Sequence, residues 1–244
     1  MLEWLKRLLH RPEGDRAICT AVVPAAGTSS RMGGRDKLME PLGGMPVLLH
    51  TLRALDDCPQ IDEIIVVTRS DLIASLGQLC RDAACSKVSK LIVGGETRTH
   101  SVLAGIREAR KDAALIAIHD GARPLVSQEI LQAVITKAAA CGAAAPAVPT
   151  KDTIKRASHG VVSATLVRDE LFAVQTPQVF EASMIRAALE KTLEEGVSVT
   201  DDCTAIERMG MSVCLTQGSY ENIKITTPED LAIGEALLNW RDSL

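Results

Sequence analysis

Short apolar runs of β type alternate along this chain with longer segments of helical periodicity, and this alternation constrains the fold more than any other feature. Strands are predicted at 18–23, 64–68, 90–93, 115–118, 144–148 and 211–216, and helices near 46–56, 71–82, 97–110, 127–141, 181–195 and 228–239. Such alternation is typical of crossover units, which build a mostly parallel sheet with helices on both faces. The sequence therefore predicts an α/β fold, with ligands bound at the carboxyl ends of the strands.

Residues 152–165 break the alternation. DTIKRA and VVSAT flank a Ser-His-Gly turn at 158–160, and this pattern predicts a two-stranded hairpin. Because an isolated hairpin is only marginally stable in water, we expect it to lean on another surface.

Composition narrows the classes of function. Lys plus Arg total 27 against 31 for Asp plus Glu, so the net charge of −4 argues against a nucleic-acid surface. The seven scattered cysteines form no zinc pattern and are expected to be reduced thiols. No apolar run approaches the roughly 20 residues of a membrane span, and Lys6, Arg7 and His10 interrupt the first leucines, so no secretory signal is expected. We expect a cytoplasmic protein with no membrane partner.

The first predicted strand runs directly into PAAGTSSRMGGRDK at 24–37. Small residues there let the main chain approach a ligand closely, and Arg31 and Lys37 supply charges that complement phosphate oxygens. The loop matches neither the Walker A pattern nor a dinucleotide-binding fingerprint. The alternative is an ordinary Gly-rich connection with solvated cations.

Further polar segments follow the other predicted strands: GGETRTHSV at 94–102, HDGARP at 119–124, KDTIKR at 151–156, QTPQVF at 175–180, TDD at 200–202 and NIKITTPEDL at 222–231. In this order and spacing, from about residue 17 to about 238, the chain resembles the 2-C-methyl-D-erythritol 4-phosphate cytidylyltransferases of the non-mevalonate isoprenoid pathway. The resemblance implies a Rossmann-like nucleotidyltransferase domain at 17–244, after an N-terminal extension at 1–16. It also implies a β-arm at about 150–168 that embraces a second subunit in a homodimer.

The resemblance also assigns roles to individual residues. The catalytic residues are Arg31, Lys37, Arg168 and Lys224. The nucleotide-binding residues are Pro24, Ala25, Ala26, Gly27, Gly94, Gly95, Glu96, Ser101 and Asp120. The residues that address the sugar phosphate are Asp120, Arg123, Thr153, Arg168, Thr176, Thr200 and Lys224, and Asp120 is also the metal ligand.

The residues themselves also allow purely structural roles. The cations are common as solvated surface residues, the small residues as turn formers, and Asp120 as a cap or turn acceptor. His119 is expected to pack or form hydrogen bonds, and Arg98 to tether its loop. Asp201 and Asp202 are interpreted as solvated acids near a helix start, with support of the metal as the alternative. Ser29 stands where the family often has glycine, so the phosphate loop is expected to differ in shape.

The residue types fit nucleotidyl transfer better than hydrolysis. Neither the G-x-S-x-G motif nor the H-E-x-x-H motif of hydrolases occurs in the sequence. In nucleotidyl transfer, by contrast, the attacking substrate phosphate is already ionised. Side-chain cations and Mg²⁺, or a similar divalent cation, are needed only to overcome the repulsion between the two phosphates. The resemblance implies transfer of CMP from CTP to 2-C-methyl-D-erythritol 4-phosphate with release of pyrophosphate. Alternatives are transfer to ribitol 5-phosphate, guanylyl or uridylyl transfer to a sugar 1-phosphate, and a catalytically silent nucleotide-binding module.

Overall fold

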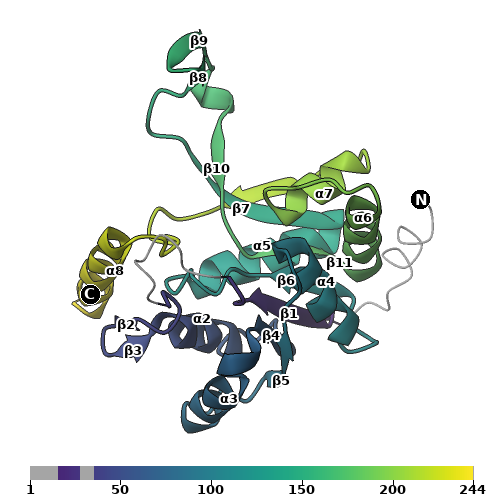
Figure 1. Cartoon of the computed structure of the whole chain (residues 1–244), viewed down its shortest axis with the longest axis vertical. Helices are drawn as coiled ribbons and strands as arrows, with labels where there is room; N and C mark the ends of the chain where they lie inside the picture. The colour runs from purple at the N-terminus through teal and green to yellow at the C-terminus, as the bar shows by residue number, and fades with distance from the viewer. Residues whose placement is uncertain (1–15, 28–35, 244) are drawn as a thin grey trace.

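The computed structural model describes residues 16–27 and 36–243, and its centre is an eight-stranded sheet (Figure 1). The sheet contains β1 (Cys19–Pro24), β4 (Glu63–Thr68), β5 (Val88–Val93), β6 (Leu115–Ile118), β7 (Ala143–Pro149), β10 (Phe172–Val174), β11 (Gln178–Glu181) and β12 (Cys214–Gln217). Two small pairs lie outside it: β2 (Pro41–Leu42) with β3 (Met45–Pro46), and β8 (Lys155–Ser158) with β9 (Val161–Thr165). The helices are α2 (Val47–Asp56), α3 (Ile73–Asp82), α4 (Arg98–Glu108), α5 (Gln128–Cys141), α6 (Ala182–Glu194), α7 (Asp202–Arg208) and α8 (Pro228–Asp242), with 3-10 turns η2 (Ser70–Leu72) and η3 (Arg168–Glu170).

The main path of the sheet runs β10-β7-β11-β6-β1-β4-β5, and β12 pairs with β7. Strand β1 lies parallel to β4 and β6, β4 is parallel to β5, and β12 is parallel to β7, which confirms the predicted mostly parallel sheet. Strand β11 runs antiparallel between β6 and β7, and β10 runs antiparallel to β7. The sequence pattern does not predict β10 or β11, and for α7 it indicates only a helix start near Asp201 and Asp202, because each element is too short to show a clear period.

Helices cover both faces of the sheet, as predicted. On one face α2, α3 and α5 bury leucines, isoleucines and valines against β1 and β4, whose inward side chains include Val23 and Val66. On the other face α4, α6 and α7 pack against Val22, Val67 and Phe180. Adjacent residues of one strand thus point into different cores, which is the two-residue period of a strand. The result is a sheet buried on both sides, with its strand ends left for loops.

Main-chain hydrogen bonds hold the strand-end loops over one edge of the sheet. Ala25 donates to the oxygen of Val67 at 2.7 Å, and Gly94 donates to Thr68 at 2.8 Å. His119 donates to Val22 at 3.0 Å. From a distant part of the chain, Ile225 donates to Ala122 at 2.8 Å, so the segment that carries Lys224 is held at the same edge.

Strands β8 and β9 form the predicted hairpin, which projects from the body as an arm (Figure 1). His159 and Gly160 have φ of 47° and 79°, and such left-handed residues suit a tight hairpin turn. Val161 and Val162 remain exposed on the arm, at 71% and 57% of their surface. Residues 1–15 of the expected N-terminal extension lie outside the described residues.

Two further findings concern composition. All seven cysteines are unpaired, and Cys80 and Cys85 are buried thiols, as expected for reduced core residues. Among the described residues, the structure contains no helix that is both long and apolar enough to cross a membrane.

Candidate active site

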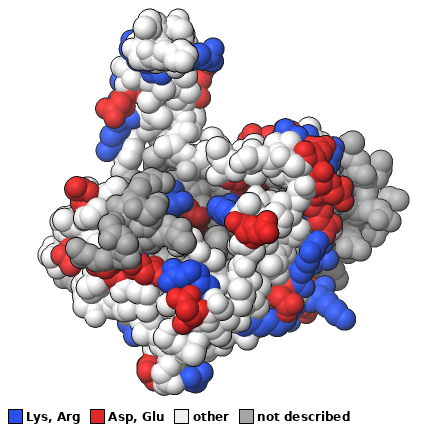
Figure 2. Space-filling view, in the orientation of Figure 1, with Lys and Arg blue, Asp and Glu red and all other residues white. Residues whose placement is uncertain are grey.

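A pocket of about 350 Å³ opens where the strand-end loops meet, and Figure 2 shows acidic and basic side chains gathered around a hollow on this face. Its lining includes ten of the residues predicted from the sequence: Pro24, Ala25, Ala26, Gly27, Lys37, Gly95, Glu96, Ser101, Asp120 and Lys224. Arg98 and Thr97 also line it. The structure therefore brings most of the predicted nucleotide residues to one place, together with two of the four predicted catalytic cations.

The small residues in and next to the pocket lining fit together closely. A Cβ atom added to Gly94 would lie 2.6 Å from Cβ of Ala26 and 2.9 Å from Oγ of Ser101, so only glycine fits there. Ser101 Oγ accepts a hydrogen bond from the nitrogen of Gly95 at 3.1 Å and donates to Thr97 O at 3.0 Å. This serine fixes the loop after β5 against the start of α4.

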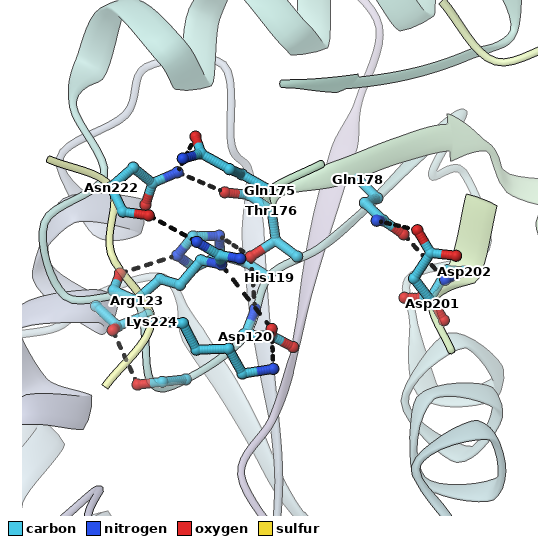
Figure 3. A network of polar contacts seen from close by, with 12 residues as sticks. His119, Asp120, Arg123, Gln175, Thr176, Gln178, Asp201, Asp202, Asn222 and Lys224 are labelled. Atoms are coloured by element: carbon cyan, nitrogen blue, oxygen red, sulfur yellow. Dashed lines mark hydrogen bonds and ion pairs between the residues drawn. The ribbon is translucent and has the colours of Figure 1, made fainter. Parts of the chain in front are cut away.

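Three cations lie around Asp120, and Figure 3 shows two of them, Arg123 and Lys224. Its Oδ2 atom is 2.7 Å from Lys224 Nζ and 4.0 Å from Arg123 Nε, and its Oδ1 atom is 3.5 Å from Arg98 Nη2. Burial opposes the charged form, but the fields of Lys224, Arg98 and Arg123 outweigh it and hold the pKa of Asp120 well below its ordinary value. The carboxylate is thus kept ionised at the wall of the pocket, where it offers oxygen to a cation or a hydroxyl.

Arg98 makes its shortest contacts with Asp202, not with Asp120. The guanidinium binds both carboxylate oxygens of Asp202, at 2.9 Å from Nη1 to Oδ1 and 2.7 Å from Nη2 to Oδ2. Asp202 is only 1% exposed, so its interpretation as a solvated acid is wrong, because a partner far away in sequence covers it. Burial raises the pKa of Asp202, and the Arg98 guanidinium opposes that shift. Arg98 does tether its loop, to the start of α7.

A chain of hydrogen bonds supports Asp120 from behind. The nitrogen of Asp120 donates to Thr176 Oγ1 at 3.0 Å, and Thr176 Oγ1 lies 3.0 Å from His119 Nδ1. His119 Nε2 lies 3.2 Å from the oxygen of Arg123, which can only accept, so Nε2 carries the proton and Nδ1 accepts from the threonine hydroxyl. Burial is the main cause that lowers the pKa of His119 to about 4. The expected hydrogen-bonding role of His119 is confirmed.

Thr176 and Arg123, which were predicted to bind the sugar phosphate, take part in the hydrogen-bond network behind Asp120. Thr176 is 5% exposed and its hydroxyl is used by the chain just described. Arg123 donates from Nη1 to the oxygen of Asn222 at 2.6 Å, and Asn222 Nδ2 donates to the oxygen of Thr176 at 3.0 Å. Asn222 thus links the Lys224 segment to the cluster around Asp120. Asn222 was not among the residues predicted for the site from the sequence. The residue does lie in the NIKITTPEDL motif, but a sequence motif does not show that a polar side chain is buried.

The remaining predicted residues lie elsewhere. Thr153, Arg168 and Thr200 are exposed and outside the pocket lining, the first two at the base of the arm. Arg31 and Ser29 are outside the described residues. One chain therefore presents a pocket with Lys37, Asp120 and Lys224, while Thr153 and Arg168 lie next to the hairpin strands and outside the pocket lining.

A doubly covered sheet with small residues, lysines and an ionised aspartate at its strand ends defines an α/β protein of the nucleotidyltransferase class. A family model agrees with this class along nearly the whole chain. The chain belongs to the 2-C-methyl-D-erythritol 4-phosphate cytidylyltransferase (IspD) family, whose model matches residues 19–240.

Individual relatives support the same assignment. The chain is 42% identical over 220 residues to the 2-C-methyl-D-erythritol 4-phosphate cytidylyltransferase of Halalkalibacterium halodurans, covering 90% of this chain and 96% of the relative. It is 45% identical over 226 residues to that of Caldanaerobacter subterraneus, covering 90% and 98%. Among solved structures, the 4-diphosphocytidyl-2C-methyl-D-erythritol synthase of Anaerococcus prevotii superimposes with a TM-score of 0.82 at 31% identity, covering 91% of this chain and 96% of that one. The resemblance recognised in the sequence motifs is confirmed.

Proposed function

We propose that this chain transfers CMP from CTP to 2-C-methyl-D-erythritol 4-phosphate, giving 4-diphosphocytidyl-2-C-methyl-D-erythritol and pyrophosphate in isoprenoid precursor synthesis. The observation that carries the proposal is that family membership spans residues 19–240 and so includes every loop that lines the pocket. The lining itself, which contains Lys37, Lys224 and the ionised Asp120, suits two phosphorylated substrates.

The reaction is a direct in-line displacement. An ionised oxygen of the polyol phosphate attacks the α-phosphorus of CTP, the bond to the β-phosphate oxygen breaks, and pyrophosphate leaves with that electron pair. No side-chain nucleophile or strong base is needed, so the protein contributes position and charge. By the family resemblance, Lys37 and Arg31 would bind the nucleotide phosphates, and Lys224 and Arg168 would orient the attacking phosphate. The main chain at 25–27 and 94–95 and the side chain of Ser101 enclose the cytidine.

A divalent cation, Mg²⁺ or a similar ion, fits this arrangement. The carboxylate of Asp120 is held ionised at the pocket wall, and oxygen is the donor that hard cations prefer. The described residues hold no group of three or more potential metal-binding side chains, so CTP phosphates and waters would supply most of the coordination. The bound cation neutralises phosphate charge. Asp120 would hold it and also meet a ribose or polyol hydroxyl.

The arm supports a homodimer in which substrate sites are completed in trans. Val161, Val162 and Val167 are exposed on or beside the hairpin, at 71%, 57% and 62%, and such apolar surface suits contact with a second copy. Thr153 and Arg168, exposed at the arm, would then reach the partner's pocket, and Thr200 would border the polyol. Thr176, whose buried hydroxyl supports Asp120, would act on the polyol through Asp120. Seven unpaired cysteines agree with a reducing, cytoplasmic location.

Pyrophosphate release with a panel of substrates tests the function. Each nucleoside triphosphate is paired with methylerythritol 4-phosphate, ribitol 5-phosphate and a sugar 1-phosphate. A site matched to the branched erythritol leaves polar groups unpaired with the wrong polyol, so kcat/KM should favour methylerythritol phosphate by orders of magnitude. A preference for ribitol 5-phosphate would keep the cytidylyl transfer and overturn the pathway assignment. Absence of pyrophosphate release with every pair would indicate a silent nucleotide-binding module.

A further inference from the structure

The guanidinium of Arg98 is shared unequally between two carboxylates at the pocket. Both of its terminal nitrogens bind Asp202, at 2.9 and 2.7 Å, while its contact with Asp120 Oδ1 is 3.5 Å long. Charge-assisted hydrogen bonds of this kind are ordinarily about 2.7–2.9 Å, so the pair with Asp202 is formed in full and the contact with Asp120 is weak. The bonds to Asp202 thus keep the Arg98 guanidinium from forming a close contact with Asp120.

Asp202 is well suited to hold its place. It is the first residue of α7, and its nitrogen donates to Gln178 Oε1 at 3.0 Å, as does the nitrogen of Cys203 at 3.1 Å. Gln178 Nε2 donates in turn to Asp201 Oδ2 at 2.9 Å (Figure 3). One glutamine on β11 therefore fixes the start of α7, so the main chain that carries the buried Asp202 side chain is anchored to the central sheet.

The unequal sharing leaves the two oxygens of Asp120 in different states. Oδ2 is bound by Lys224 Nζ at 2.7 Å, whereas Oδ1 has, among the described residues, only the long contact with Arg98. Within the described part of the chain, Asp120 is the other carboxylate that lies within 4 Å of Arg98. If Asp202 lost its charge, the guanidinium, a fork that binds two oxygens, would shift onto Asp120. Asp120 would then be bound by cations on both oxygens and would offer less to a ligand.

We propose that Asp202 is a positioning residue that withholds Arg98 from Asp120 and so keeps Oδ1 of Asp120 available to the divalent cation that accompanies CTP. The inference rests on the proposed function, because it presumes a cation bound with the nucleotide. It assigns a role to a pair of residues that lie on the start of two helices, α4 and α7, and meet only in the folded chain.

The test measures Mn²⁺ binding directly, by electron paramagnetic resonance of the free ion, with enzyme saturated by the α,β-methylene analogue of CTP. Asp202→Asn should raise the half-saturating Mn²⁺ concentration roughly tenfold, in the range found when support of a metal ligand is lost. The double variant Arg98→Ala with Asp202→Asn should recover binding to within about threefold of wild type, because the competing cation is gone. Loss of structural support alone would not be rescued by a second truncation.

Asp201→Ala is the matched control. It removes the N-cap of α7, where Oδ1 of Asp201 accepts from the nitrogen of Thr204 at 3.0 Å, but leaves the charges of Arg98 and Asp202 in place. It should lower the midpoint of thermal unfolding and leave Mn²⁺ binding unchanged. If Asp202→Asn does not fold, Arg98→Lys is the second variant, because it keeps the charge of Arg98 but loses the fork that binds both oxygens of Asp202. It should weaken Mn²⁺ binding, by a smaller factor than Asp202→Asn.

Three results would overturn the proposal: wild-type Mn²⁺ binding in folded Asp202→Asn, no recovery in the double variant, or equal weakening by Asp201→Ala. With Arg98→Lys as the folded variant, unchanged binding would overturn it too. Failure of the wild-type enzyme to bind Mn²⁺ with the analogue, or to release pyrophosphate, would instead count against the proposed function.

Discussion

Lys224 Nζ lies 2.7 Å from Asp120 Oδ2, although the two residues are far apart in the sequence. The contact exists because Ile225 donates its main-chain hydrogen to Ala122, two residues beyond Asp120, at 2.8 Å. Asn222 reinforces this clamp through its bonds to Gln175 and Thr176. The lysine that the family resemblance assigns to the substrate phosphate is therefore held against the carboxylate assigned to the metal.

Replacing Lys224 with Ala should lower kcat/KM for the polyol phosphate by roughly 10² to 10³, the range for loss of one preorganised charge. CTP binding should change by only a few fold, because Lys37 and the small-residue loops remain. Steady-state kinetics with each substrate varied in turn separate the two effects. Lys191→Ala, which removes a surface lysine paired with Glu195, is the control and should behave as wild type. A larger loss in CTP binding than in polyol phosphate use would contradict the assignment.

Replacing Lys37 or Arg31 with Ala should each lower kcat by roughly 10² to 10³, because each is assigned to charge that builds on the α-phosphate. Arg31→Lys should rescue poorly, since a single ammonium cannot bind two phosphate oxygens as a fork. Single-turnover measurements isolate the chemical step. Lys37 lines the pocket, whereas Arg31 is predicted from the sequence alone. Wild-type turnover in both Ala variants would refute the role.

Acid should destabilise the protein through His119. Its pKa is about 4 in the folded protein against 6.5 ordinarily, so the unfolded chain binds the extra proton first as pH falls. The contribution of the neutral His119 to the free energy of unfolding is complete above about pH 6.5 and is lost as the pH falls from about 6.5 to about 4. The loss is on the order of 3 kcal/mol. Urea unfolding of wild type and His119→Asn across this range should show a flatter pH dependence in the variant. Parallel curves would contradict the prediction.

Charge placed on the arm should break the dimer. Val161→Asp with Val162→Asp puts two carboxylates on surface that we expect to be covered by a second copy, and burial of unpaired charge is costly. Sedimentation should show a wild-type dimer and a monomeric variant, with activity lower by roughly tenfold or more. Ala232→Asp, on an exposed position of α8, adds a similar charge elsewhere and should stay dimeric. A fully active wild-type monomer at assay concentration would refute the arm's role.

Periodicity was enough to predict most of the fold. The runs at 64–68 and 115–118 and the amphipathic stretches before and after them appear as β4, β6 and the helices between, with ends displaced by a residue or two. The Ser-His-Gly turn predicted the hairpin. Strand β11 was missed because four residues after Pro177 show no clear period, and its antiparallel insertion between β6 and β7 depends on pairing partners distant in sequence.

The sequence by itself determined the α/β class, the strand-end loops, the family and the residue types at the pocket, because apolar period and ordered motifs are local properties of the chain. Only the tertiary structure decided which charges meet. Arg98, Asp120, Asp202 and Lys224 come from four separate segments, and whether an acid is solvated or buried in an ion pair depends on what packs against it. The local sequence around Asp202 does not distinguish it from a solvated surface acid. Its burial against Arg98 follows from how α4 and α7 pack on one face of the sheet.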